Sequence, residues 1–325
     1  MRRLSRRSLL ASALPATAAV LAHAQDAAYP RHAVTVIVPF APAGSADLSA
    51  RLLAEKLEQR LGKPFVVENH PGTGTVMATN YLARARPDGY TFMIAGSTLA
   101  IEATLYRKLP YDPAKDFTLA ALVASLPFVL VVNPSLPAHS VADLVALART
   151  KRLSFGSSGT GSFGYVAAEL FASMTGIKLT HVPYKGSALA LPDLVRGYIQ
   201  LMFTGLAPAL PLIAAGKLRA LGLTGKKRNA AAPEIAPLAE AGVPGFDATA
   251  WQGIIVPAKT PVDVSMTLNT EINAVLATAD VRAQLKGLGM SPIGIGSLAE
   301  LAHFLQSEIR HWASIIEAAG MARSV

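Results

Sequence analysis

A strand, a short loop of small residues and an amphipathic helix follow one another near the start of the chain, and this unit recurs along its length. Val34–Val38 is a run of β-branched residues long enough for a strand buried on both faces. Pro39, Pro42 and Gly44 end the run, and leucines at helical spacing follow over residues 48–61. Such repeats predict parallel strands with right-handed crossovers, and ligands held outside the carboxyl ends of the strands.

The same pattern predicts further elements. Strands are expected over residues 65–68, 91–95, 153–157, 179–182, 201–203, 218–224 and 253–256. Helices are expected over residues 76–84, 141–149, 164–174, 262–278 and 298–319, and one more helix is expected to end near Gly197, with Pro192 as an unexplained break. The apolar run 119–132 passes through Pro127 and is predicted to cross from one lobe to the other, and the strand over 218–224 to return to the first lobe.

The chain is too long for one ordinary core, since its 325 residues suggest two lobes of about 100–200 residues each. A hydrophobic content of 51% with 16% charged residues indicates a folded globular protein. The absence of cysteine from the sequence excludes a disulfide scaffold, a thiolate zinc site and a cysteine nucleophile. We expect an export signal over residues 1–24, a first lobe of residues 25–124 plus 223–325, and a second lobe of residues 125–222.

The N-terminal segment is typical of an export signal, with four arginines, an apolar middle and an A-x-A cleavage site at Ala22-His23-Ala24. Residues 5–10 resemble a twin-arginine signal, and an ordinary Sec signal is the alternative. Removing the four arginines lowers the formal net charge from +9 to +5. That excess fits an acidic small ligand, whereas the basic residues are too thinly spread for a nucleic-acid stripe. We therefore predict a soluble protein outside the cytoplasm.

Two loops carry the pattern of an anion site. The loops over residues 39–47 and 69–75 contain glycine, serine and threonine just ahead of helices. Glycine permits close backbone approach, hydroxyls donate without charge, and the first N–H groups of a helix are unpaired. Either loop alone could be a short connector, but two at neighbouring strand ends favour a binding site. Asp47 or Ser45 is placed to cap the first helix.

A third loop matches G-x-G-x-x-G over residues 159–164, between a strand and a helix. A dinucleotide site also needs an acidic residue about 20 positions later, at the end of the next strand. Here that strand ends in Pro183-Tyr184-Lys185. A loop for a carboxylate or a small phosphate explains the glycines without the missing acid.

The sequence offers little for catalysis or metal binding. Its histidines show no metal-ligand spacing, and it has no H-E-x-x-H, G-x-S-x-G or Walker motif. Ser157 or Ser158 as a nucleophile would need a base and an orienting acid nearby. Trp251 and Tyr184 could flank a ligand or belong to the core. We predict no catalytic residue, no metal and no cofactor.

Successive blocks of the chain resemble the solute-binding proteins of tripartite tricarboxylate transporters, of the Bug or TctC type. The blocks are VTVIVPFAPAGSADLSARLLAEKL, VVENHPGTGT, ARPDGYTFMI, LPYDPAKDF, HVPYKGSALALPDLVRG, GKLRALGLT and GVPGFDATAWQGIIVPAKTP. They stand in the family's order, from about Tyr29 to the C-terminus.

The resemblance implies an α/β fold of the type II-like periplasmic binding proteins. Each of two lobes is a mostly parallel sheet flanked by helices, and crossing hinge strands join the lobes. It also implies a periplasmic monomer that captures a small organic carboxylate, such as a di- or tricarboxylate or an aromatic acid, for membrane subunits of a transporter. The alternatives are a binding protein that feeds a sensor kinase and a periplasmic enzyme that acts on a carboxylate; we predict a binding protein and not an enzyme.

The resemblance implies that residues of both lobes bind the ligand. In the first lobe these are Phe40, Ala43, Gly44, Ser45, Asp47, Gly72, Thr73, Gly74, Thr75 and Ser97. In the second lobe they are Ser157, Ser158, Thr160, Gly161, Tyr165, Tyr184 and Thr204.

The chain departs from the family's usual pattern at several of these positions. The family usually has two glycines at Ala43-Gly44, a threonine at Ala46, a histidine at Tyr165 and an aspartate at Thr204. A neutral polar end at the last two positions suits an aromatic or dicarboxylic acid and disfavours a ligand with a distal ammonium group.

Overall fold

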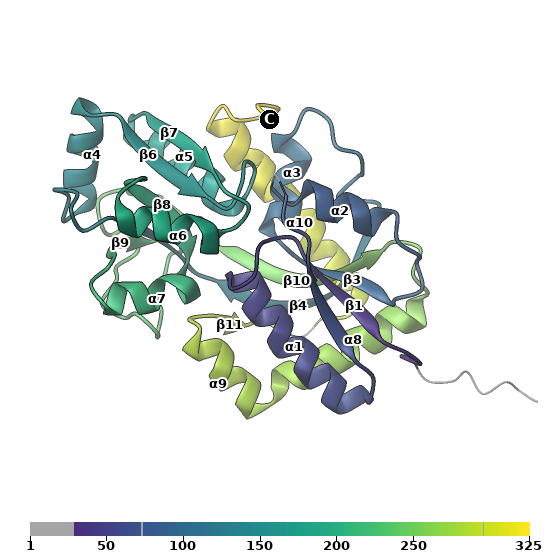
Figure 1. Ribbon diagram of the computed structural model, residues 1–325. Coiled ribbons are helices and arrows are strands. Elements are labelled where there is room, and N and C mark those ends of the chain that lie inside the picture. Colours follow the sequence, from purple (N-terminus) through teal and green to yellow (C-terminus); the bar gives the residue numbers. More distant parts are fainter. Residues whose placement is uncertain (1–28, 73, 295) are drawn as a thin grey trace, which may run out of the picture.

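The structure, a computed structural model, describes residues 29–72, 74–294 and 296–325 of the chain. Two β-sheets with helices on both faces form the centres of two lobes (Figure 1). The predicted export signal lies outside the described residues. Within the three described ranges, no helix is both long and apolar enough to cross a bilayer.

The first sheet has six strands. They are β1 (Val34–Val38), β2 (Phe65–Asn69), β3 (Thr91–Gly96), β4 (Phe117–Leu126), β10 (Ala250–Pro257) and β11 (Ser291–Pro292). The spatial order is β11-β4-β10-β3-β1-β2. The β-branched run forms β1, which pairs in parallel with β2 and β3, as its burial on both faces predicts. Strand β10 runs antiparallel to β3 and β4.

The second sheet has five strands in the order β7-β6-β8-β5-β9. They are β5 (Phe128–Val132), β6 (Leu153–Ser157), β7 (Leu179–Pro183), β8 (Leu201–Gly205) and β9 (Arg219–Leu223). Strand β6 is parallel to β7 and β8, whereas β5 is antiparallel to β8 and β9.

Two details of the predicted topology are corrected. Both sheets are mixed, not mostly parallel, because each contains strands that carry the chain between the lobes and pair antiparallel with a neighbour. The strand expected over residues 218–224 to return to the first lobe is β9, which pairs with β5 in the second sheet. The chain re-enters the first sheet at β10.

Helices cover both faces of each sheet. They are α1 (Ser45–Leu61), α2 (Val76–Ala83), α3 (Ser97–Leu105), α4 (Val141–Thr150), α5 (Phe163–Thr175), α6 (Ser187–Arg196), α7 (Leu206–Ala214), α8 (Val262–Ala277), α9 (Ala279–Gly287) and α10 (Leu298–Ala318). Alternate residues of β1 point to opposite cores: Val36 packs in the core with Leu53 of α1, and Ile37 in the core with Leu82 of α2. The sequence did not predict α3, α7 or α9, which begin at or within two residues of the preceding element.

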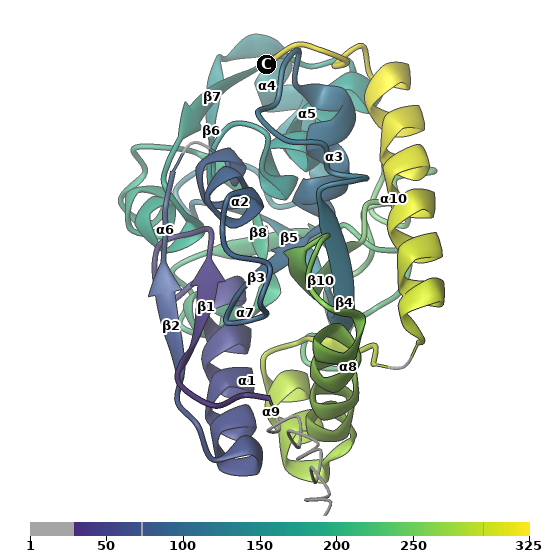
Figure 2. The ribbon, with the colours of Figure 1, turned by 90° about the vertical axis from the view of Figure 1, so that its right-hand side faces the viewer.

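The chain crosses between the lobes at Pro127, as the apolar run predicts. Leu126 ends β4 in the first sheet and Phe128 begins β5 in the second. Helix α10, yellow in Figure 2, lies along α3 and β4 and also contacts α5 of the second lobe. The strand crossings and this helix set the two lobes against each other.

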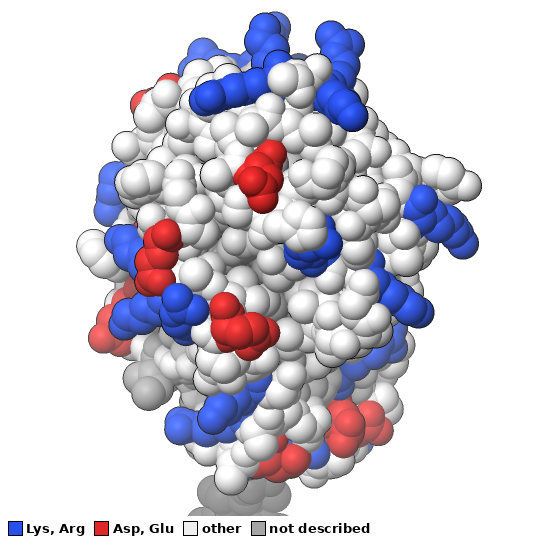
Figure 3. All heavy atoms as spheres, turned by 90° about the vertical axis from the view of Figure 1, so that its left-hand side faces the viewer, with Lys and Arg blue, Asp and Glu red and all other residues white. Residues whose placement is uncertain are grey.

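Charged side chains of both signs are scattered over the surface. On the face in Figure 3, lysine and arginine lie interspersed with aspartate and glutamate, with uncharged residues between them. This pattern differs from the single-sign stripe that binds a nucleic-acid backbone.

Candidate ligand-binding site

A cavity lies between the two sheets, at the carboxyl ends of their parallel strands. Its wall includes Phe40 just after β1, Gly96 at the end of β3, and Thr204 and Gly205 at the end of β8. It leaves about 80 Å³ for the centres of water-sized spheres. Because one water needs roughly 10–15 Å³ by this measure, the cavity suits a small organic molecule.

The wall of the cavity is uncharged and combines a few polar side chains with a larger apolar part. Its polar members are Ser45, Thr75, Thr79, Ser97, Thr98, Ser158, Ser187, Thr204 and Gln252. Its larger apolar members are Phe40, Met93, Ile94, Leu99, Leu126, Phe128, Phe163, Met202, Phe203 and Trp251. Among the described residues of the wall, none has a charged side chain. A ligand would therefore meet hydroxyls, backbone groups and hydrocarbon.

Several helices begin at this wall with glycine as the N-cap. Gly44 precedes α1, Gly96 precedes α3 and Gly205 precedes α7, and each of these glycines lines the cavity. Helix α6 follows Gly186, and its first residue, Ser187, lines the cavity. A glycine has no side chain with which to cap the first N–H groups of a helix. At α1 and α3 these groups and the helix dipoles favour an anion at the cavity. At α7 the Leu206 amide already donates to the Pro127 carbonyl at 3.0 Å, and Pro208 has no N–H group.

Two polar side chains of the wall have hydrogen-bonding groups that a ligand could use. Thr204 is 1% exposed, and its Oγ1 has no hydrogen-bond partner within the described part of the chain. An unsatisfied buried hydroxyl costs about 1–3 kcal/mol, which a bound ligand could recover. Gln252 accepts a hydrogen bond at Oε1 from the Ser49 hydroxyl, 2.6 Å away. That contact leaves the amide nitrogen of Gln252 as the donor for the cavity.

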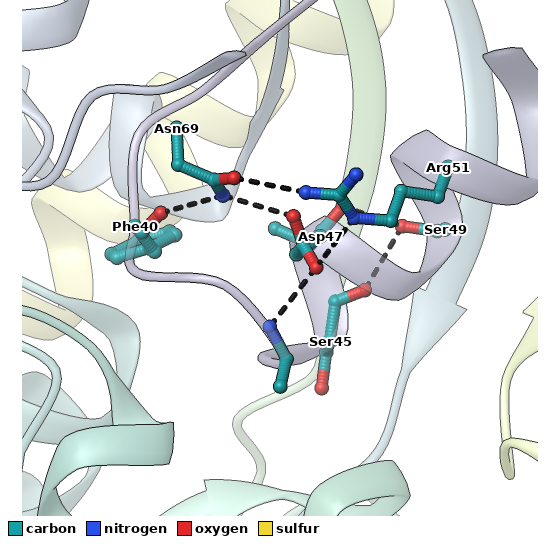
Figure 4. Close-up of polar contacts among 8 residues, drawn as sticks. Phe40, Ser45, Asp47, Ser49, Arg51 and Asn69 are labelled. Atoms are coloured by element: carbon teal, nitrogen blue, oxygen red, sulfur yellow. Dashed lines mark hydrogen bonds and ion pairs between the residues drawn. The ribbon is translucent and has the colours of Figure 1, made fainter. Parts of the chain in front are cut away.

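Asp47 holds the first loop in place and does not line the cavity. Its Oδ2 accepts from the Ala43 amide at 2.9 Å and from Arg51 Nε at 3.0 Å, and its Oδ1 accepts from Asn69 Nδ2 at 2.9 Å. Figure 4 shows these side chains pointing toward one another, with Asn69 also donating to the Phe40 carbonyl. Burial alone would raise the pKa of Asp47, but these hydrogen bonds outweigh it and hold the pKa below its usual range.

The start of α1 corrects the predicted cap. The N-cap is Gly44, and neither Ser45 nor Asp47 occupies that position. Ala43, just before it, has a left-handed φ of 66°. This conformation costs a residue with a Cβ about 1–2 kcal/mol, which explains why glycine would suit position 43. The hydrogen bond from its amide to Asp47 helps to hold the strained loop.

Loops of the two lobes touch beside the cavity. The Ala41 amide donates to the Lys185 carbonyl at 3.1 Å, and the Tyr106 hydroxyl donates to the Thr160 carbonyl, also at 3.1 Å. A Cβ added to Gly74 would lie only 2.6 Å from the Thr160 carbonyl oxygen. The structure thus shows the lobes closed on each other, with glycine at a point of backbone contact.

The structure brings part of the predicted ligand-binding set to the cavity wall. The predicted residues that line the cavity are Phe40, Gly44, Ser45, Thr75, Ser97, Ser158 and Thr204. Those that lie outside its lining are Ala43, Asp47, Gly72, Gly74, Ser157, Thr160, Gly161, Tyr165 and Tyr184. Thr73 lies outside the described residues.

The two tyrosines of the predicted set have other partners. The Tyr184 hydroxyl donates to Asp193 Oδ2 at 2.8 Å, and burial together with this acceptor raises the pKa of Tyr184 to about 12. Tyr165 packs against Phe155 and His181, with ring centroids 6.3 Å and 4.7 Å away. The ring contacts hold Tyr165, which is partly buried, against β6 and β7 of the second lobe.

Ser157 lies beside a histidine, and the enzyme alternative would require an acidic residue to complete a Ser-His-acid triad at this point. Ser157 Oγ lies 2.7 Å from His181 Nε2 and 3.0 Å from the Gly159 carbonyl, which accepts its proton. Ser157 is fully buried and outside the cavity lining. No hydrogen bond or ion pair from a carboxylate to His181 is found among the described residues, so a Ser-His-acid triad is not formed there.

Sequence reasoning missed Ser187 and Gln252. Ser187 follows Gly186, whose φ of 148° turns the chain into α6. Gln252 is a buried polar residue within an apolar strand, and that contrast was a signal available in the sequence. Across the described ranges, no group of three or more histidine, cysteine, aspartate or glutamate side chains could hold a metal ion.

Comparison with known proteins identifies the family. Residues 49–321 match the family described as the tripartite tricarboxylate transporter family receptor, TctC. The chain belongs to this family. It is 34% identical to Protein BugT of Bordetella pertussis over 309 residues, covering 94% of each chain. It is 36% identical over 292 residues to the UPF0065 protein in the tcbD-tcbE intergenic region of a Pseudomonas strain, covering 89% of this chain and 87% of that one.

Solved structures agree with this assignment. R. palustris Rpa4515 with adipate has a TM-score of 0.87 and 38% identity, over 91% of this chain and 99% of that one. MatC from Rhodopseudomonas palustris with bound malate has a TM-score of 0.85 and 31% identity, over 89% of this chain and 100% of that one. The periplasmic binding protein BugD has a TM-score of 0.87 and 29% identity, over 90% of this chain and 99% of that one. The family and these neighbours are binding proteins with two lobes, as the sequence predicted.

Proposed function

We propose that this TctC-family receptor works in the periplasm as a monomer, captures a small organic carboxylate between its lobes and delivers it to the membrane subunits of a tripartite transporter. The observation that carries the proposal is the uncharged cavity at which several helices begin with glycine N-caps. Such a wall offers backbone N–H groups and hydroxyls to an anion without a resident cation.

Hydrogen-bond donors of both lobes lie at the cavity wall. Hydrogen bonds to a charged acceptor are roughly twice as strong as neutral ones. The N-termini of α1 and α3 belong to the first lobe, and the Thr204 hydroxyl belongs to the second. A carboxylate that bonds to both sets stabilises the closed arrangement by its greater affinity for it.

The apolar part of the wall indicates the body of the ligand. Phe128 and Phe163 pack with ring centroids 4.4 Å apart and line the same cavity as Met93 and Met202. Small-molecule sites combine such hydrocarbon with a few placed polar groups. We therefore favour an acid with an apolar chain or ring. The adipate in the Rpa4515 structure is an acid of this kind.

Ligand-induced closure is the physical step that a membrane partner would recognise. The contacts between Ala41 and Lys185 and between Tyr106 and Thr160 form where the two lobes meet. A ligand that bridges the lobes favours these contacts, and the surface created by closure is then the signal for the transporter.

A thermal-shift screen tests the proposal. Mono-, di- and aromatic carboxylates are compared with their amides, for example adipate with adipamide, and calorimetry follows each hit. A ligand at 100 times its Kd adds about 2.7 kcal/mol to the free energy of unfolding, so a true ligand raises Tm by several degrees. Equal stabilisation by acid and amide, or a preference for a cationic amino acid, would contradict a carboxylate site.

A further inference from the structure

A glutamate without solvent exposure lies beneath one wall of the cavity. Glu102, on α3, has 0% exposed surface. Its Oε1 accepts from the Thr75 hydroxyl at 2.5 Å, and its Oε2 accepts from the Tyr111 hydroxyl at 2.6 Å. Burial raises the pKa of Glu102 to about 7, although these hydrogen bonds act in the opposite direction. None of the features used above for ligand capture involves this carboxyl group.

Thr75 connects Glu102 to the cavity, because it contacts the carboxyl group and also lines the cavity. A hydroxyl has one proton to donate. When Glu102 is ionised, that proton points to Glu102 and Thr75 offers only lone pairs to the cavity. When Glu102 is protonated, its own O–H can donate to Thr75 Oγ1, and the threonine proton is then available to an anion in the cavity.

We propose that this receptor binds its anionic ligand together with one proton, which is held by Glu102 and communicated to the ligand through the hydroxyl of Thr75. This inference rests on the proposed function, in which the ligand is a carboxylate. The proton comes from solvent and converts the Glu102 carboxylate to the acid. The entering proton neutralises Glu102 and so offsets one negative charge of the entering anion.

Electrostatics and hydrogen bonding both favour this coupling. Two negative charges separated by one hydroxyl repel each other strongly where water is excluded. An ionised Glu102 therefore opposes a carboxylate at the wall that Thr75 helps to form. Protonation of Glu102 removes the repulsion. It also frees the Thr75 hydroxyl proton, which can then be donated to the ligand.

Glu102 has a pKa closer to neutrality than the tyrosines around it. The titratable groups that face it are Tyr106 and Tyr111; burial raises the pKa of Tyr106 to about 12 and raises that of Tyr111 further. From α5, Tyr165 lies near Tyr106 and also has a raised pKa. From α10, the Glu308 carboxylate is held by the indole N–H groups of two tryptophans.

Calorimetry with adipate as the probe measures the proton directly. Titrations of the full mature chain at pH 7.5, in two buffers of different ionisation enthalpy, give the protons taken up per adipate bound. We expect an uptake of about 0.5–0.8 proton for the wild type and none for Glu102→Gln. The wild-type Kd should also weaken by up to about tenfold per pH unit above pH 7, whereas the Kd of Glu102→Gln should change less than about twofold.

Glu169→Gln is the matched control. Burial raises the pKa of Glu169 as well, but this residue lies on α5 and does not line the cavity. The control should retain the wild-type proton uptake and pH dependence. Binding of adipate without proton uptake, or uptake that persists in Glu102→Gln, would overturn the inference and leave the proposed function intact.

A second measurement does not depend on adipate. The ¹³C chemical shift of the Glu102 carboxyl group, assigned by its loss in Glu102→Gln, is followed with pH in the protein alone. A midpoint near 7 supports the inference, and a midpoint near the ordinary glutamate value of about 4.3 overturns it. Failure of adipate to bind would count against the proposed ligand class, and this midpoint would still decide whether Glu102 carries the proton.

Discussion

Helices that begin at the cavity and helices that begin on the outside of the molecule differ in whether a side chain caps their first N–H groups. On the outside, α4 and α10 begin with complete capping boxes at Ser140 and Ser297. At the cavity, α1, α3 and α7 begin at Gly44, Gly96 and Gly205, which have no side chain to cap them. A serine cap contributes about 1 kcal/mol to stability. The cavity therefore keeps donors for a ligand where a local cap would use them.

Two helices limit how far this comparison can be taken. Helix α8 begins at the exposed Pro261 and has no side-chain cap, so its first N–H groups face water. Helix α5 has Ser162 as a cap although its first residue, Phe163, lines the cavity. An uncapped start indicates a ligand only when the start also forms the wall of a cavity. Substitutions at the cavity and on the outside of the molecule test this difference.

Gly74→Leu should have the largest effect. A Cβ at this position would lie 2.6 Å from the Thr160 carbonyl oxygen, so the lobes could not close fully. We expect adipate to bind about a hundredfold more weakly, or about 2.7 kcal/mol by calorimetry. Gly62→Leu is the control, because Gly62 has a similar φ of 67° with nothing within 4 Å of the added Cβ. Equal affinities of the two variants would refute the role of closure.

Thr204→Val removes a buried hydroxyl at the cavity wall that is available to bond a ligand. We expect about tenfold weaker binding of adipate, or about 1.4 kcal/mol, because a hydrogen bond to a charged group is lost. The Tm of the protein without ligand should stay the same or rise, since the hydroxyl has no partner among the described residues. Thr224→Val is the control: its Oγ1 is also buried without a partner in that part of the chain, but it lies outside the cavity lining.

Gly44→Ser would place a cap at a helix start that now lacks one. The added Cβ meets the Ser187 hydroxyl at 3.4 Å and the Ala41 carbonyl oxygen at 3.8 Å, both ordinary contact distances. The serine oxygen would take an N–H group of α1 from the ligand, so affinity should fall by about threefold while the unfolding free energy rises by a few tenths of a kcal/mol. Calorimetry and urea unfolding measure the two changes. Tighter binding would argue that this helix start does not meet the ligand.

Ser297→Ala should leave affinity unchanged. The Ser297 hydroxyl accepts from the Glu300 amide at 3.3 Å on the outside of the molecule. Its loss should lower the free energy of unfolding by about 1 kcal/mol, measured by urea denaturation. A loss of adipate affinity in this variant would show that outer and inner helix starts are not independent.

Much of the architecture could be predicted from local sequence patterns. The β-branched run of β1, the leucine spacing of α1 and the crossing near Pro127 each follow from residues close together in the chain. The mixed pairing of the sheets could not be predicted in this way. Strand direction depends on which sheet a strand joins after the chain has crossed between lobes, and residue spacing within β9 carries no such information.

The candidate site was predicted at the level of loops and less well at the level of side chains. The loop over residues 39–47 does reach the cavity, yet Phe40 and Ser45 line it while Asp47 turns away to Arg51 and Asn69. A short polar residue next to glycine fits a ligand contact and a loop brace equally well in sequence. Only the position of Asn69, on β2, decided between them.

Turns rich in glycine and hydroxyls between strands and helices can be predicted from residue types, because backbone freedom and hydrogen-bonding capacity belong to individual residues. Which of those turns share one cavity, and which polar groups contact them, depends on how the chain packs. Ser49 holds Gln252 across 203 positions of the chain, and Thr75 holds Glu102 in a place that excludes water. Burial and long-range contact set the charge and direction of these groups, and neither is a property of a residue alone.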